Sequence, residues 1–257
     1  MSATAVLRIV ERNFTVYSKL WRGMVFSQFI GPLLFLGAMG VGLGGLVDDN
    51  VGTVDGLSYL QFVAPALMVA TGVQLAAGES LWPVMAGWKW IGFYHGMIAT
   101  PLRSADVYGG FVAWTTIRVL LSATVFLAVA AALGGVPSAW GVLAIPAGGL
   151  CAAAFCSLLG AFSIGQETDA AFSAIMRLGI VPLMLFSGTF FPVEQLPSWL
   201  RPAVVISPLW HGVELARAAT SGRFDALAII FHVAVLVGLI AVGFRWGTRA
   251  FARRLTP

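Results

Sequence analysis

Few side chains in this sequence could carry out a reaction, and the first candidates are Ser187, in the stretch LFSG, and His232. A serine beside a histidine base is the nucleophile of many hydrolases. The pattern is incomplete here, because Leu185 stands where a G-x-S-G motif has its first glycine, and the other histidines, His95 and His211, fall in connections between apolar segments. We therefore predict no catalytic residue, and we interpret Ser187 as a packing hydroxyl and His232 as a polar residue that faces other helices. An intramembrane hydrolase stays open as an alternative.

The sequence contains neither a nucleotide-binding motif nor a recognisable metal motif. A P-loop needs Gly-x-x-x-x-Gly-Lys-Ser/Thr to hold phosphates, and the only lysines, Lys19 and Lys89, are followed by Leu20 and Trp90. The stretch HGVE, residues 211–214, differs from the H-E-x-x-H zinc pattern. We expect no ATP site of the P-loop kind and no metal site in this chain.

Three charged residues lie within or beside apolar segments, where charge is expensive. Arg118 is about eleven residues into its segment, which places it near the middle of a bilayer at about 1.5 Å per residue. A cation at that depth normally faces protein or water, so a structural partner and a contact with substrate are both open for it. Glu79 and Arg177 lie near the ends of their segments and are interpreted as either anchors or gates.

Membrane-spanning helices must position these residues. The chain has 257 residues, of which 59% are hydrophobic and only 10% are charged, whereas soluble domains carry about a quarter charged residues. A bilayer core of about 30 Å needs roughly 20 apolar residues per helix, and six such segments occur. The predicted fold is an all-α integral membrane protein with six transmembrane helices, which form one permease domain over residues 25–257. The predicted spans are 25–46, 59–82, 107–133, 141–165, 174–191 and 227–245.

The distribution of charge predicts how the spans are oriented. The net charge is +4, but Lys and Arg gather at the ends of apolar segments, which favours a membrane protein over one that binds nucleic acid. They occur in the N-terminal segment, the 83–106 connection and the C-terminal tail, whereas the 47–58 connection has Asp and neither Lys nor Arg. Because cytoplasmic loops carry the excess of Lys and Arg, both termini and residues 83–106 are predicted to be cytoplasmic.

Residues 1–24 are predicted to form an amphipathic helix that lies in the cytoplasmic interface. Apolar residues recur every three or four positions, with mostly basic and polar residues between them. This pattern gives a helix one apolar and one charged face, which suits the boundary between lipid and water. A generic surface helix and a lever joined to a cytoplasmic partner are equally open interpretations. The apolar positions are Leu7, Val10, Phe14, Tyr17, Trp21 and Met24.

A proline-rich segment follows the fifth span. Pro192, Pro197 and Pro202 interrupt helices, and irregular backbone at membrane depth persists only where protein or a water-filled cavity satisfies it. We therefore expect short re-entrant helices at residues 188–217 on the extracellular side, forming a lid over a path between subunits. An ordinary external loop is the alternative. The predicted extracellular gate consists of Phe186, Gly188, Phe190, Phe191, Pro192, Leu196 and Pro197.

Three long stretches resemble a known family. They are FSGTFFPVEQLPSWLRPAVVISPLWHGVELAR at 186–217, YLQFVAPALMVATGVQLAAGES at 59–80 and IATPLRSADVYGG at 98–110. They are similar, in that order, to the proline-rich signature, the second span and the cytoplasmic coupling segment of type-2 ABC exporter permeases. This six-span family includes nodulation-factor and daunorubicin-resistance exporter permeases. Together with the span count and the N-terminal helix, the resemblance extends over nearly the whole chain.

The resemblance implies a transport subunit and not an enzyme. Two permease subunits, this chain twice or this chain with a sister chain, would pair with a dimer of cytoplasmic ABC ATPase subunits. Those partners would bind ATP and Mg²⁺, so no cofactor is expected in this chain. The coupling segment, 83–106, would transmit ATP-driven motion. The implied coupling residues are Thr100, Pro101, Leu102, Arg103 and Asp106.

The expected substrate is amphiphilic, because the transport path would be aromatic and weakly charged. A lipid-linked glycan, another lipid or a hydrophobic drug would leave the cytoplasm or the inner leaflet across the inner membrane of a bacterium. A secondary transporter is the other alternative, although the scarcity of acidic residues within the spans argues against proton coupling.

Overall fold

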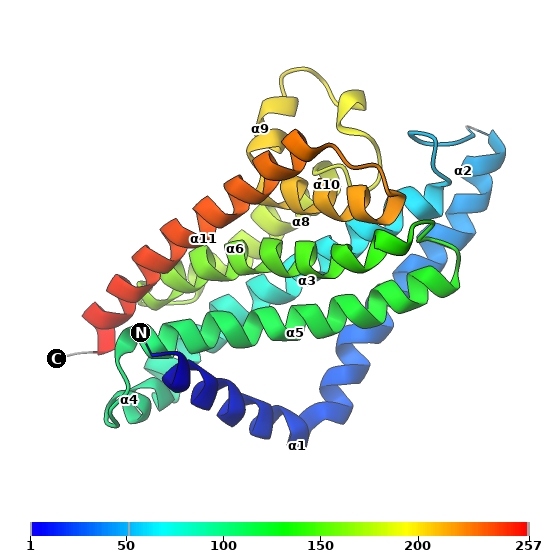
Figure 1. Ribbon diagram of the computed structural model, residues 1–257. Helices are drawn as coiled ribbons and strands as arrows, with labels where there is room; N and C mark the ends of the chain where they lie inside the picture. The colour runs from blue at the N-terminus through cyan, green and yellow to red at the C-terminus, as the bar shows by residue number, and fades with distance from the viewer. Residues whose placement is uncertain (1, 51, 256–257) are drawn as a thin grey trace.

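The computed structural model describes residues 2–50 and 52–255 of the chain. Within these residues the backbone is helical (Figure 1), apart from connections and one isolated antiparallel bridge between Val54 and Leu57. The predicted all-α fold is confirmed. Within these residues, the side chains at positions 20–29, 31, 32, 35 and 39–41 lie outside the description.

Four helices of the described part are long and apolar enough to cross a membrane. They correspond to the second, third, fourth and sixth predicted spans, where the apolar runs reach the length that a bilayer requires. The first of the four, α3, lies at the centre, with 72% of its apolar window buried against 17% for α11. The four helices are α3 (Tyr59–Met85), α5 (Ser104–Ala132), α6 (Ala144–Ile164) and α11 (Ala226–Leu255). Two short helices extend α3 and α6, namely η2 (Ala86–Trp90) and η3 (Ala139–Leu143).

Glycines in α11 allow it to pack closely on α5 and α6. A Cβ added at Gly243 would lie 2.5 Å from Oγ of Ser157, and one added at Gly247 would overlap the ring of Tyr108. The hydroxyl of Tyr108 donates a hydrogen bond to the carbonyl of Ser157, so one buried side chain joins three helices at this level.

The fifth predicted span, 174–191, is a shorter helical run, Ala170–Phe186. It begins and ends several residues earlier than predicted. The early end has a physical cause, because the chain turns at Gly188, whose φ of +76° is a conformation that other residues rarely adopt. The run consists of α7 (Ala170–Ala174), η4 (Ile175–Ile180) and α8 (Val181–Phe186).

The N-terminal helix is continuous with the first predicted span, 25–46. Helix α1 (Ala3–Leu36) passes through η1 (Gly37–Leu43) into α2 (Gly44–Asn50). Figure 1 shows α1 turning part-way along its length, so that its first part lies beside one end of the bundle and its later part reaches the other end.

The side chains of α1 are described for its first part and only in places for its later part. Leu7 and Phe14 are exposed, as on a helix that lies against lipid, whereas Ile9 packs on Gly110 of α5. The side chains of Trp21 and Met24, also predicted for the apolar face, lie outside the described part, as do many in the 25–46 span. The amphipathic unit at 1–24 and the count of six spans therefore stay predictions.

Short helices fill the proline-rich segment, as the sequence predicts. Of these, α10 lies inside the bundle against α3, α6 and α11 (Figure 1), and its Leu209, Val213 and Ala216 are fully buried. Pro202 and Pro208 stand in the first turns of α9 and α10, where a missing N–H costs no helical hydrogen bond. The helices are η5 (Val193–Gln195), α9 (Arg201–Ile206) and α10 (Pro208–Ser221).

The two ends of the bundle contain different connections. Figure 1 shows the start of α1, the short helix α4 (Phe93–Ile98) and the last turns of α11 at one end, and α2 and α9 at the other. The basic N-terminal segment, the 83–106 connection and the C-terminal arginines therefore share one end, as their predicted common side requires.

Candidate functional site

The predicted coupling residues line a cleft with the start of α1. The cleft has a volume of about 650 Å³ and lies at the end of the bundle that also holds α4. All five predicted residues, Thr100 to Asp106, contribute to its wall, opposite the first turns of the N-terminal helix. The lining residues are Ser2, Thr4, Ala5, Arg8, Thr100, Pro101, Leu102, Arg103 and Asp106.

Asp106 holds the two walls of this cleft together. One oxygen of its buried carboxylate, Oδ1, accepts a 2.8 Å hydrogen bond from the backbone N–H of Ser2, and the other, Oδ2, accepts a 3.1 Å hydrogen bond from that of Arg103. The second bond satisfies an N–H before the first turn of α5, which otherwise has no helical partner. The same carboxylate therefore caps α5 and fixes the start of α1.

Aromatic contacts connect the cleft region to other helices. The guanidinium of Arg12 lies 5.0 Å from the ring centroid of Phe93 at the start of α4. The neighbouring Tyr94 is buried and packs against Phe251 of α11, with ring centroids 5.5 Å apart, and Phe251 also packs on Tyr108 of α5. A displacement of the 93–106 region would therefore act on α1, α5 and α11 together.

Arg118 and Glu79, two of the predicted intramembrane charges, form an ion pair between α5 and α3. The distance from Arg118 Nη1 to Glu79 Oε2 is 2.6 Å, and the side chains are 6% and 28% exposed. The ring of Tyr17 lies 5.3 Å from Cζ of Arg118 and packs edge-on against Trp114. Of the two roles open for Arg118, the structure supplies the structural partner. Contact with substrate stays a prediction.

The third predicted charge, Arg177, is separate from this pair. It is exposed on η4, and no ion pair or hydrogen bond joins it to another residue of the described part of the chain. The structure thus divides the three charges into one buried pair and one surface arginine.

Arg217 holds the start of the predicted gate. Its Nη2 donates a 2.6 Å hydrogen bond to the carbonyl of Gly188, and its Nη1 forms a 2.7 Å ion pair with Glu214. Its guanidinium also lies 4.0 Å from the ring centroid of Phe62 in α3. We missed this role, although a Glu and an Arg three residues apart in an apolar stretch could have indicated a helical ion pair.

The predicted gate residues fall into packed and exposed groups. Leu196 belongs to a small buried cluster with Val193 and Val204, against which Phe191 packs, and Phe190 packs on the main core. Gly188 and Pro192 are also buried, whereas Phe186 and Pro197 are exposed. A gate role for these seven residues stays a prediction.

The candidate hydrolase residues have other partners. Oγ of Ser187 shares a hydrogen bond with Oγ of Ser207 at 3.2 Å, and Nδ1 of His232 shares one with Nδ1 of His211 at 2.7 Å. In the part of the chain that the structure describes, no histidine base is hydrogen-bonded to Ser187. In the described residues, no three His, Cys, Asp or Glu side chains lie close enough together to hold a metal ion.

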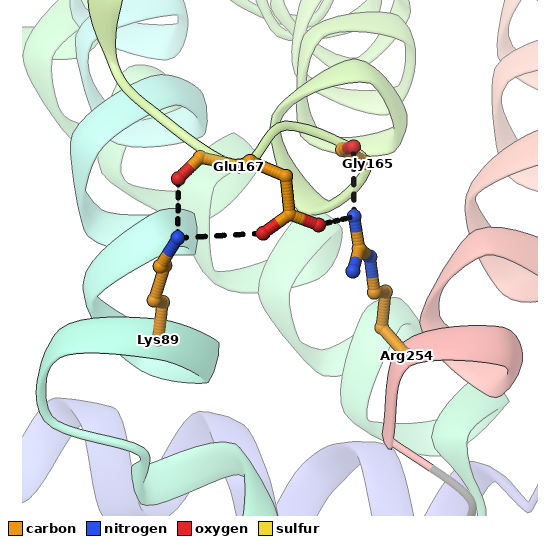
Figure 2. A network of polar contacts seen from close by, with 4 residues as sticks. All are labelled: Lys89, Gly165, Glu167 and Arg254. Carbon is orange, nitrogen blue, oxygen red and sulfur yellow. Dashed lines mark hydrogen bonds and ion pairs between the residues drawn. The ribbon is translucent and has the colours of Figure 1, made fainter.

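Glu167 links three segments at the same end as the cleft (Figure 2). Its Oε1 lies 2.5 Å from Nη2 of Arg254, and its Oε2 lies 3.4 Å from Nζ of Lys89. Lys89 also donates to the Glu167 carbonyl, and Arg254 donates to the carbonyl of Gly165 at 3.1 Å. Hydrogen bonds from Arg254 and then Lys89 hold the pKa of the Glu167 carboxyl below its ordinary value of 4.5. The network joins the end of α11 to η2 and to the turn after α6.

Comparison with known proteins finds one family and a group of similar relatives. Residues 4–220 match the sequence profile of the family described as ABC-2 type transporter. The chain is 28% identical over 249 residues to Nodulation protein J of Rhizobium leguminosarum bv. viciae, covering 97% of this chain and 94% of that protein. It is 26% identical over 251 residues to Nodulation protein J of Rhizobium meliloti (strain 1021), covering 98% and 94%. The family match, residues 4–220, includes the buried ion pair, the gate segment and every lining residue of the cleft except Ser2.

Proposed function

The chain belongs to the ABC-2 type transporter family, and we propose that it is the permease subunit of an exporter driven by a separate cytoplasmic ATPase. The observation that carries the proposal is the cleft formed by the start of α1 and residues 100–106, which all five predicted coupling residues line. A permease without an ATP site needs a surface through which a partner can displace its helices. This cleft lies where two long helices, α1 and α5, begin.

Two features support the cleft as the ATPase docking surface. Arg8 and Arg103 line it, while the one acidic lining residue, Asp106, has both carboxylate oxygens engaged by backbone N–H groups. The cleft therefore offers positive charge and apolar surface, from Pro101 and Leu102, to a partner that is acidic and apolar at the point of contact.

Motion from this surface would reach the far end of the bundle through helices. Helix α5 begins beside the cleft and carries Arg118, which is paired with Glu79 of the central helix α3. Helix α3 in turn packs its Phe62 against Arg217, whose guanidinium holds the gate carbonyl at Gly188. ATP-driven displacement of the cleft would bias this chain of contacts between a closed and an open gate, as a two-state element requires.

We place the end that holds the cleft in the cytoplasm. The basic N-terminal segment, the 83–106 connection and the C-terminal arginines all lie at that end, and cytoplasmic loops carry the excess of Lys and Arg. The gate segment then faces outward from the inner membrane, which is the side on which an exporter releases its substrate.

A second permease subunit would cover an apolar face that this chain leaves open. The run Ala170–Phe186 exposes Leu178, Val181 and Leu185, which recur at spacings of three and four and so lie on one side of a helix. A path between two such faces, closed outside by the aromatic gate segment, suits an amphiphilic substrate such as a lipid-linked glycan, another lipid or a hydrophobic drug.

The test is a charge introduced into the cleft, with a matched charge outside it. Leu102→Glu should reduce retention of the ATPase in mild detergent and uncouple ATP hydrolysis from export, because a carboxylate would replace an apolar contact. Ile91→Glu is the control, since Ile91 is an exposed apolar residue of the same connection that does not line the cleft. Normal export by Leu102→Glu, or equal loss in both variants, would contradict the proposed docking surface.

A further inference from the structure

Three arginines form a stripe on one face of the last helix. Arg245, Arg249 and Arg253 are four residues apart, so they follow one another along α11. With Trp246 and Val242 they line a groove of about 400 Å³, and all three arginines are exposed. None has an ion pair with an acidic side chain of residues 2–50 or 52–255. We call these three residues the arginine stripe.

The depth of the arginine stripe follows from the length of the helix before it. The nineteen residues from 226 to 244 include no Asp, Glu, Lys or Arg and span about 28 Å at 1.5 Å per residue. That length matches the hydrocarbon core of about 30 Å. Arg245 therefore begins the headgroup layer, and Trp246, which is half-exposed, has the position typical of an interfacial anchor.

The neighbouring Arg254 has an acidic partner within the protein, whereas the arginine stripe has none among the described residues. Glu167 pairs with Arg254 on another side of the helix (Figure 2). The ring centroid of Trp88 also lies 4.9 Å from its guanidinium carbon. The protein thus neutralises one arginine of this turn with its own carboxylate. Like charges at i and i+4 repel each other, so the three arginines of the stripe favour anions supplied from outside the chain.

We propose that the arginine stripe binds the headgroup of an anionic phospholipid in the cytoplasmic leaflet. Guanidinium groups donate paired hydrogen bonds to phosphate, and Val242 and Trp246 provide apolar surface for the start of an acyl chain. The charge, the depth and the groove favour a lipid over a protein partner, because the same groove extends from the headgroup level into the hydrocarbon. Lipid binding itself needs no ATPase, whereas its assignment to the cytoplasmic leaflet rests on the orientation given with the proposed function.

The test measures lipid retention by the full chain with native mass spectrometry. The protein is released from mixed phosphatidylglycerol and phosphatidylcholine vesicles, and phosphatidylglycerol should be retained over phosphatidylcholine. Each arginine near an anionic surface contributes roughly fivefold to binding, so Arg249→Gln should lower phosphatidylglycerol retention about fivefold. Replacing all three arginines by glutamine should lower it on the order of a hundredfold.

Arg254→Gln is the control, because it removes the same charge from the residue next to Arg253, which Glu167 neutralises. It should leave lipid retention unchanged, and 0.5 M NaCl should weaken retention in the parent protein. Equal retention of the two lipids, or no loss in the triple variant, would overturn the proposal. Displacement of the lipid by inorganic phosphate at equal concentration would also overturn the proposal, because it would indicate an anion site. Loss of a protein partner without loss of lipid would overturn it too, because it would indicate a protein interface.

Discussion

Removing either member of the Arg118–Glu79 pair should destabilise the protein, and the two losses should differ. Glu79→Leu leaves the guanidinium of Arg118, 6% exposed, without its carboxylate. Breaking a buried pair in this way costs about 3–5 kcal/mol. Arg118→Met leaves Glu79, which is 28% exposed and can recover water or bind a proton, so we expect a smaller loss of about 1–3 kcal/mol.

The double variant, Glu79→Leu with Arg118→Met, separates this pair from other causes of instability. Replacing both charges by apolar residues of similar size removes the unpaired charge, so the double variant should be more stable than Glu79→Leu alone. The two changes should therefore be coupled by more than about 1 kcal/mol in a double-mutant cycle.

Thermal unfolding in detergent, followed by tryptophan fluorescence, measures these differences. In a chain of this size, 1 kcal/mol shifts Tm by roughly 2–4 °C, so Glu79→Leu should lower Tm on the order of 10 °C. Additive losses in the double variant would contradict a direct coupling of Arg118 and Glu79 and would mean that Arg118 has its important partner elsewhere. If the double variant is stable but exports poorly, substrate contact by Arg118 becomes the favoured role.

Three further predictions follow from packing, the gate and the Glu167 network. Gly247→Ala should destabilise the protein by about 1–3 kcal/mol in thermal unfolding, because the added methyl group overlaps Tyr108. Gly238→Ala has open space around it and should be neutral or stabilising, so equal effects of the two changes would contradict the close packing at Gly247. Arg217→Gln should lower Tm by a few degrees and increase leak through the gate in a vesicle efflux assay, because the carbonyl of Gly188 loses its charged donor. An unchanged leak would count against a gate held by this residue. The pKa of Glu167 is lower in the folded protein than in the unfolded chain, so its carboxylate stabilises the fold at pH values above the unfolded pKa, and this contribution is lost as pH falls through the folded pKa. Proteolysis of the C-terminal end of α11 should therefore increase at that low pH, and an identical pH profile for Glu167→Gln would contradict this role.

The sequence predicts the elements whose signal is local. Runs of about 20 apolar residues identify α3, α5, α6 and α11, and prolines identify the short helices after the fifth span. Boundaries are less predictable, because they depend on single dihedral angles or on what surrounds a helix end. The left-handed Gly188 ends the fifth run earlier than its apolar residues suggest, and α11 continues beyond 245 because arginines can remain helical in a headgroup layer.

The contacts that define the candidate sites are long-range, so one sequence does not reveal them. Arg118 meets Glu79 only because α3 and α5 pack side by side, and Asp106 meets Ser2 only because α1 folds back along α5. The resemblance to a family could indicate residues 100–106 as a coupling segment. That its partner wall is the start of α1 required the three-dimensional structure.

The proposed function depends on an ATPase that docks in the cleft between the start of α1 and residues 100–106. It is tested most directly by crosslinking from a cysteine introduced at the cleft, Thr100→Cys, to a P-loop ATPase that co-purifies with the chain. Both native cysteines are buried, and Ser138→Cys, in the connection at the other end of the bundle, is the matched control. We expect a crosslink from residue 100 and none from residue 138. A retained ATPase that crosslinks only from residue 138, or no ATPase bound to the folded chain, would contradict it.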